Sequence, residues 1–138
     1  RNMMVICPDK INQKRHVNVF KNKSNVLDHM EKHAELIKPK FDLVNKKLSS
    51  LPDHIGNFTN PTGGYFVTFY AKNPIAKRIV SLCNEAGFML TPAGSTYPYG
   101  NDPRDSVLRI APTYIDINEL DLAMDIFVLA AQIADSES

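Results

Sequence analysis

A chain of 138 residues, 43% of them apolar and with a net charge of +1, is long enough for one hydrophobic core and short for two domains. Nine Pro and six Gly are too few for a collagen-like or low-complexity chain. The apolar runs fall short of the roughly 20 residues that cross a membrane. We therefore expect a soluble, globular single domain with no membrane partner.

The cysteines and the start of the chain favour a cytoplasmic setting. Cys7 and Cys83 lie far apart in the sequence, which predicts neither a disulfide framework nor a zinc knuckle. No charged segment followed by an apolar stretch and a cleavage site opens the chain, and it starts at Arg1 without an initiator Met. These features predict a processed or truncated chain from a reducing compartment.

Charge is distributed unevenly along the chain. Residues 1–47 carry eleven Lys or Arg against five Asp or Glu, whereas residues 48–138 carry five against ten. A nucleic-acid site would interleave such basic residues with aromatic ones, and only Phe20 and Phe41 occur in the first third. We expect the solvated face of a helix and no nucleic-acid partner.

The first long element is predicted to be a helix, because apolar residues recur every three or four positions from Leu27 to Leu51. Ser24 or Asn25 is expected to cap its start. Pro39 removes one backbone hydrogen bond, which predicts a kink or two helices end to end. A coiled coil is the alternative to a helix that faces the core. The apolar stripe consists of Leu27, Met30, Ala34, Ile37, Phe41, Val44, Leu48 and Leu51.

Three later segments are predicted to be strands, because they are short and rich in β-branched, aromatic or other apolar residues. A helix is expected between the first two, opened by Pro74 and ended by Gly87, with Cys83 on its core-facing side. The predicted strands span residues 65–71, 88–91 and 106–111.

The last element is predicted to be a helix that Asp116 and Glu119 open as a capping box and that ends near Ala134, before a frayed acidic tail at 135–138. The resulting order is helix, strand, helix, strand, strand, helix. This order predicts an α+β fold, a two-layer α/β sandwich in which helices cover a small, mostly antiparallel sheet.

Two groups of residues resemble catalytic or metal sites, but each lacks a residue that such a site requires. His29 and His33 stand four apart, but Met30 occupies the position where a metalloprotease helix needs Glu. Cys7 has His16 within sequence reach but no third group to orient the pair. We expect no metal site and no thiol catalysis.

Arg109 is the residue that best indicates binding. In a strand it shares a face with Val107, so a full charge lies in an apolar segment and needs an anionic partner. Its planar guanidinium suits a carboxylate, to which it can donate two parallel hydrogen bonds. A structural ion pair with Asp102, Asp105 or another acid of the chain is an equally open interpretation of the strand alone.

The loop before this strand favours a ligand. It runs from Thr91 to Pro103 and is dense in Pro, Gly, hydroxyl groups and tyrosines. Long loops of this composition are usually functional, although surface variability is the alternative. Its candidate site residues are Thr96, Tyr97 and Tyr99.

Several motifs, in their order and spacing, resemble the C-terminal small domain of fold-type I pyridoxal-phosphate aminotransferases. A second set is similar to the bacterial aspartate aminotransferases once described as regulator-like, and the resemblance extends from about Pro8 to Ala134. The motif Asn60–Gly63 also resembles a cofactor-contacting motif of the large domain, but here it follows the long helix and runs into Gly64–Phe66. The first set is Pro61–Phe66, Gly87–Gly94 and Leu108–Pro112, and the second is Asp9–His16, His33–Phe41 and Ala93–Gly100.

The resemblance implies that this chain is one domain of a longer enzyme and that the functional residues are divided between its two domains. Residues 1–25 would lead from a missing large domain and 26–138 would form the small domain, in which Arg109 binds the substrate α-carboxylate. In this family a lysine forms a Schiff base with pyridoxal phosphate. No Ser-rich segment ending in Lys is present, and Lys10 matches a stretch downstream of that lysine. No catalytic residue and no bound cofactor are therefore expected in this chain alone.

The resemblance also implies the substrates and the assembly. They are an amino acid such as aspartate and a 2-oxo acid, with 2-oxoglutarate as the amino acceptor. The full-length enzyme would be a homodimer held mainly through large domains, which leaves the fragment free to be monomeric. The competing hypothesis is a stand-alone, non-catalytic binding or oligomerisation module of aminotransferase ancestry.

Overall fold

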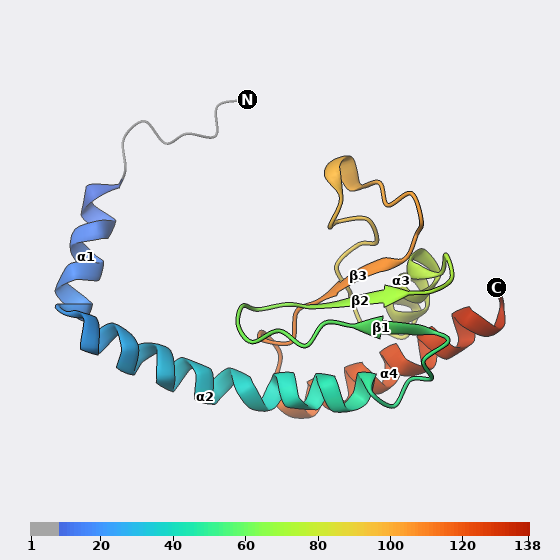
Figure 1. Ribbon diagram of the computed structural model, residues 1–138, viewed down its shortest axis with the longest axis horizontal. Helices are drawn as coiled ribbons and strands as arrows, with labels where there is room; N and C mark the ends of the chain where they lie inside the picture. The colour runs from blue at the N-terminus through green and yellow to red at the C-terminus, as the bar shows by residue number, and fades with distance from the viewer. Residues whose placement is uncertain (1–8) are drawn as a thin grey trace. The chain divides into compact units, whose positions relative to one another are not determined.

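The computed structural model describes residues 9–138, so Cys7 and the other predictions for residues 1–8 lie outside the described residues. The chain divides into two compact units, one ending at Leu36 and the other spanning Ile37–Ser138 (Figure 1). Within the described part, none of the helices has the length and apolar character needed to span a membrane.

The described residues of the first unit form two helical segments, joined by Lys21 and Asn22. It contains α1, which was not predicted from the sequence, and the first part of α2. Asp9 caps α1 by accepting a hydrogen bond from the amide of Asn12 at 3.0 Å. No residue of α1 is buried, in keeping with the solvated face expected for this basic segment. The bounds are Lys10–Phe20 for α1 and Lys23–Leu48 for α2.

The start of α2 differs from the prediction by a few residues. The helix begins at Lys23, so Ser24 and Asn25 lie inside it and cap nothing. Asn22 caps the start of α2 instead, because its side-chain oxygen accepts a hydrogen bond from the amide of Asn25 at 3.0 Å. Of the two alternatives predicted at Pro39, two helices end to end is wrong and a kink stays a prediction. Pro39 lies within a single helix, which tolerates the one missing amide while its last turns are anchored in the core.

The apolar stripe of α2 is buried only in its second half. Val44 and Leu48 are fully buried, whereas Leu27 is 52% and Met30 is 59% exposed. The prediction that the whole stripe faces one core is therefore wrong for its first half. The exposed half lies in the first unit and the buried half in the second.

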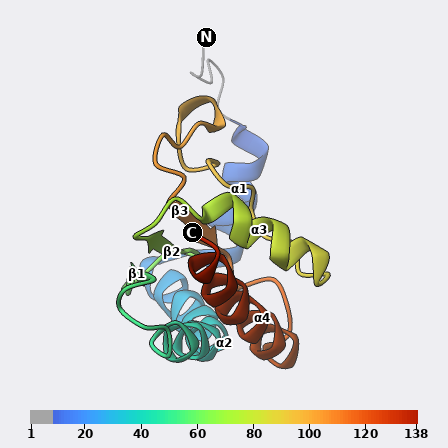
Figure 2. The same cartoon turned by 90° about the vertical axis from the view of Figure 1, so that its right-hand side faces the viewer.

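The second unit is a two-layer structure, as predicted. An antiparallel sheet of order β1-β2-β3 forms one layer, and helices form the other (Figure 2). The buried side chains of the strands belong to one cluster with those of α3, α4 and the end of α2, so the helices cover one face of the sheet. The elements are β1 Gly56–Phe58, β2 Val67–Ala71, α3 Ala76–Glu85, a short 3-10 turn η1 Pro98–Gly100, β3 Val107–Ile110 and α4 Ile117–Ser136.

Three strand predictions need correction. Residues 88–91 form no strand, because the amide of Phe88 bonds to the carbonyl of Cys83 at 2.8 Å and continues the end of α3. Strand β1 was not predicted, since its three residues are too short to show an alternation. Strand β2 begins at Val67, so Tyr65 and Phe66 precede it and are partly exposed.

The end of the chain is ordered by contacts with α3, so the prediction of a frayed tail is wrong. Arg78 donates to both carboxylate oxygens of Glu137, at 2.7 and 3.0 Å. This hydrogen-bonded pair raises the pKa of Arg78 and lowers the pKa of Glu137. At the other end of α4, Asp116 is the N-cap, as predicted, and it accepts from the amide of Asn118 at 2.9 Å rather than from that of Glu119, which the predicted capping box would use. Helix α4 is therefore capped at its start and tied to α3 at its end, and its buried side chains belong to the core cluster.

Helix α3 agrees with its predicted core face. Cys83 is fully buried in the core cluster, and this burial raises the pKa of its thiol to about 11 because a thiolate would lose its solvation. The helix starts at Ala76, two residues after Pro74. Gly87 has a φ of +84°, the left-handed conformation expected of the residue that ends a helix. Cys83 therefore fills the core, as predicted.

Candidate functional site

The face of the sheet opposite the helix-packed core carries Arg109. In β2 and β3 the core-facing residues include Phe69 and Leu108, which are paired across the strands. Thr68 is paired with Arg109 in the same register, so both point to the other face. The prediction that Arg109 lies on a different face from Leu108 is confirmed.

Among the described residues, the guanidinium of Arg109 has an aromatic neighbour and no anionic one. Its Cζ lies 4.4 Å from the ring centroid of Phe66, a cation–π contact. Its Nε is buried and has no hydrogen-bond partner among residues 9–138. Within the same residues, Arg109 forms no ion pair. A partly buried charge in this state favours an anion supplied from outside the described chain.

The two carboxylates considered as structural partners of Arg109 are engaged elsewhere. Asp105 accepts a hydrogen bond from the amide of Lys77 at 3.1 Å, at the start of α3. Asp102 binds backbone amides that follow it and is itself buried. The structural ion pair is therefore not formed, and the non-catalytic module loses the observation that would have favoured it.

Asp102 fixes the turn that leads into β3. Its Oδ1 accepts from the amide of Arg104 at 3.0 Å, and its Oδ2 accepts from the amides of Ser106 and Val107 at 2.8 and 2.9 Å. Burial by itself raises the pKa of this carboxyl, but the amide donors outweigh it and lower the pKa below its usual range. Asp102 thereby sets where β3 begins, and so fixes the position of Arg109 on that strand.

Asp102→Ala is expected to reduce the free energy of unfolding by about 1–3 kcal/mol at pH 7, because three amides lose their acceptor. A lowered folded-state pKa gives stability that is present above the unfolded pKa of about 3.9 and is lost as the pH falls through the folded value. The loss caused by the substitution should therefore shrink at pH 3. Chemical denaturation of both proteins at the two pH values measures it, and an equal loss at both would contradict this role.

The loop that was predicted to line the site is closed on itself by two glycines. Gly94 has a φ of +84°, and a Cβ there would lie 2.2 Å from the carbonyl oxygen of Gly100. Tyr99 also has a positive φ, of +59°, and its side chain is fully exposed. Conformations of this kind in non-glycine residues concentrate at functional sites. The loop therefore combines a close backbone approach of Gly94 to Gly100 with an exposed tyrosine at the preceding position.

The loop that contains η1 joins the end of α3 to β3, the strand that carries Arg109. Figures 1 and 2 show the loop that contains η1 rising from the sheet on the side away from α4. Thr96 is exposed and Tyr97 is partly buried. No hydrogen bond within residues 9–138 joins Thr96, Tyr97 or Tyr99 to Arg109. The role of these loop residues beside Arg109 therefore stays a prediction.

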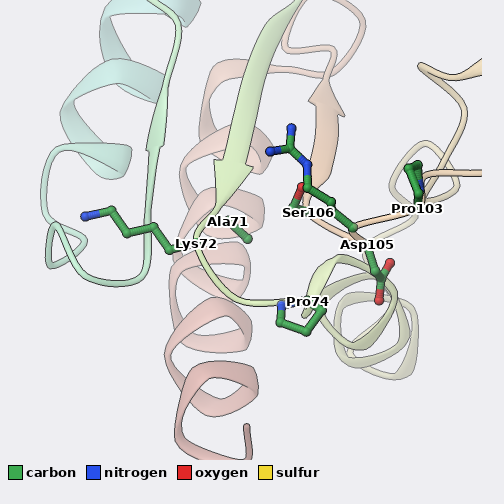
Figure 3. Close-up of a pocket in the computed structure, with 7 residues that line it drawn as sticks. Ala71, Lys72, Pro74, Pro103, Asp105 and Ser106 are labelled. Atoms are coloured by element: carbon green, nitrogen blue, oxygen red, sulfur yellow. The ribbon is translucent and has the colours of Figure 1, made fainter.

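A separate surface hollow of about 370 Å³ lies between the end of β2 and the turn before β3 (Figure 3). In Figure 3 the side chain of Lys72 points away from the turn that carries Pro103 and Asp105. Arg109 does not line this hollow. The lining residues are Ala71, Lys72, Pro74, Pro103, Arg104, Asp105 and Ser106.

The histidines considered as metal ligands form a ring contact. The imidazoles of His29 and His33 are stacked with their centroids 6.3 Å apart, and Phe20 lies edge-on to His29 at 5.2 Å. Residues 9–138 contain no cluster of three or more His, Cys, Asp or Glu side chains that could hold a metal ion.

Phe66 is the site residue that sequence reasoning missed. It was assigned to the strand that begins the β2 region, with no role beside Arg109. The signal that could have found it is the alternation along the chain, because Phe66 and Thr68 are two residues apart and Thr68 is paired with Arg109. That pairing becomes known only when the register of β2 and β3 is known.

Comparison with known proteins identifies the family to which this fold and site belong. The family model described as aspartate amino-transferase matches residues 2–138, which is almost the whole chain. The chain belongs to the aspartate aminotransferase family. Curated members of the family are about three times longer, and the chain corresponds to the small domain of such an aminotransferase, as predicted.

Two curated relatives of the aspartate aminotransferase family show how much of the enzyme is present. A Mycolicibacterium smegmatis protein named as an aminotransferase is 41% identical over 135 residues, covering 96% of this chain and 32% of its own length. An aspartate aminotransferase of Corynebacterium glutamicum is 40% identical over 122 residues, covering 87% and 28%. The chain therefore spans about a third of the length of the curated relatives it matches.

A solved structure agrees with the family assignment. The structure of an aspartate transaminase from Corynebacterium glutamicum superposes with a TM-score of 0.89 at 37% identity, and the match covers 96% of this chain and 32% of that one. The α+β two-layer fold is therefore that of an aminotransferase small domain.

Proposed function

We propose that this chain is the small domain of a pyridoxal-phosphate-dependent aspartate aminotransferase, and that Arg109 binds the α-carboxylate of its substrates. The observation that carries the proposal is the guanidinium of Arg109, which is partly buried and has no anionic partner among residues 9–138. A planar carboxylate suits such a group better than a spherical anion, because it accepts two parallel hydrogen bonds.

The domain boundaries follow the same proposal. Residues 1–25 lead from a large domain that precedes this chain, and residues 26–138 form the small domain. The exposed apolar side chains of Leu27 and Met30, on a helix whose later stripe is buried, support a further covering surface in the whole protein. That surface is expected to be the remainder of the enzyme.

Pyridoxal phosphate, when bound, supplies the electron sink for amino transfer. This chain would supply a binding group for the substrate that reacts beside the cofactor. That group is the guanidinium of Arg109, which lies on an otherwise apolar strand and whose Nε has no hydrogen-bond partner among residues 9–138. Under the proposal, the lysine that reacts with the cofactor lies in the large domain, and Arg109 orients the amino acid or 2-oxo acid. The loop with Thr96, Tyr97 and Tyr99 borders the bound substrate.

The proposed substrates are aspartate and 2-oxoglutarate, in keeping with the name of the Corynebacterium glutamicum relative. The full-length enzyme is proposed to be a cytoplasmic homodimer whose subunits meet through their large domains. Nucleic acid and membranes are not among its proposed partners.

The test is amino transfer by the full-length protein that carries this chain. It should convert aspartate and 2-oxoglutarate to oxaloacetate and glutamate when supplied with pyridoxal phosphate. The oxaloacetate formed is measured by its reduction in a coupled assay. This chain alone should be inactive in the same assay. An antibody against the small domain should detect a protein about three times the length of this chain in the source cell. A band of the length of this chain, or a full-length protein without activity on any amino acid, would overturn the proposal.

A further inference from the structure

Phe66 stands in an unusual place for a large aromatic residue. It lies just before β2, is 44% exposed, and contacts the guanidinium of Arg109 with its ring at 4.4 Å. Phe69, on the other face of the same strand, is fully buried and packs on Phe127. Phe66 is therefore not filling the helix-packed core, and its described ring contact is with the charged residue of the site.

The guanidinium of Arg109 has few other restraints. Its Nε–H is buried without an acceptor, and its terminal nitrogens form no ion pair within residues 9–138. A long side chain without hydrogen bonds can rotate among several rotamers, and this freedom is lost when a ligand binds. The ring of Phe66 is the described contact that can fix the plane of the guanidinium beforehand.

We propose that Phe66 is a positioning residue, which holds the guanidinium of Arg109 so that a carboxylate binds end-on, through the two terminal nitrogens. This inference rests on the proposed function and adds to it how the carboxylate approaches. One hydrogen-bonding edge of the guanidinium is closed, because the buried Nε removes the side-on approach that would use Nε and one terminal nitrogen. The ring of Phe66, 4.4 Å from Cζ, restrains the group from the ring side. The edge formed by Nη1 and Nη2 remains for the ligand.

The arrangement selects for ligand shape as well as charge. A carboxylate matches the terminal edge of a fixed guanidinium with two parallel hydrogen bonds, and a freely rotating guanidinium would lose part of this advantage. Both half-reactions should depend on Phe66, because the amino acid and the 2-oxo acid present the same α-carboxylate. The KM of an amine substrate that lacks the carboxylate should not change when Phe66 is replaced.

The experiment compares Phe66→Leu with Tyr70→Leu in the full-length enzyme. Tyr70 is a matched control, since it lies on the same face of the same segment, is 42% exposed, and has no ring contact with Arg109 among the described residues. Phe66→Leu should raise KM for aspartate and for 2-oxoglutarate by about 3- to 30-fold with little change in kcat. It should also raise the inhibition constant of a simple dicarboxylate such as succinate. Tyr70→Leu should change neither.

A second variant separates positioning from folding. Phe66→Tyr keeps the aromatic face and should restore KM to within about threefold of the parent, because tyrosine also stacks on guanidinium groups. Equal losses in Phe66→Leu and Phe66→Tyr, or a fall in kcat with KM unchanged, would overturn the positioning role.

The result is distinguishable from a failure of the proposed function. If the parent enzyme transfers amino groups and Arg109→Ala abolishes carboxylate binding while Phe66→Leu has no effect, the positioning role alone is wrong. If Arg109→Ala also has no effect, the carboxylate site itself is wrong.

Discussion

Arg109→Ala in the full-length protein should lower kcat/KM for aspartate by roughly 30- to 1000-fold, equivalent to about 2–4 kcal/mol of lost transition-state binding. The substitution removes the guanidinium that has no anionic partner among the described residues and leaves the core-facing side of β3 intact. Most of the effect should appear as a higher KM for both the amino acid and the 2-oxo acid. Steady-state kinetics with each substrate varied in turn measures it.

A lysine at the same position is the informative control. Arg109→Lys keeps the positive charge but loses the planar pair of donors, so it should recover only part of the lost kcat/KM. Both variants should unfold at nearly the same denaturant concentration as the parent, since neither removes an ion pair seen in residues 9–138. An unchanged kcat/KM for aspartate in Arg109→Ala would remove Arg109 from the substrate site.

Phe127→Ala should reduce the free energy of unfolding by about 3–5 kcal/mol, the largest stability effect that we expect. Phe127 is fully buried in α4, and its ring packs edge-on against that of Phe69 with centroids 5.3 Å apart and planes 87° apart. Truncation leaves a cavity between the helix layer and the central strand, and the surrounding side chains can fill it only in part. Denaturant unfolding followed by circular dichroism measures the change.

Leu129→Ala is the matched control for this stability prediction. Leu129 lies half a turn further along the same helix and is 58% exposed, so its truncation should change the free energy of unfolding by no more than about 0.5 kcal/mol. Comparable losses in the two variants would mean that α4 is not the helix that covers the sheet.

Local sequence patterns predicted those elements whose signals are complete within a few residues. The period of α2, the β-branched residues of β2, the cap at Asp116 and the glycine after α3 all depend on neighbouring positions, and each is found within a few residues of its expected place. Strand β1 and the loop at 88–91 show the opposite case. Three residues carry no readable alternation, and an apolar run such as 88–91 becomes a strand only where a neighbour offers its backbone.

The chain's own sequence determined the α+β fold class, the side of β3 on which Arg109 lies and, through the order of its motifs, the resemblance to an aminotransferase small domain. Only the tertiary structure decided that Asp102 and Asp105 bind backbone amides and leave Arg109 without them. It also brought Phe66 against Arg109. The physical reason is that side-chain alternation is a local property of a strand, whereas the partner of a charge depends on the register between strands that are distant in sequence.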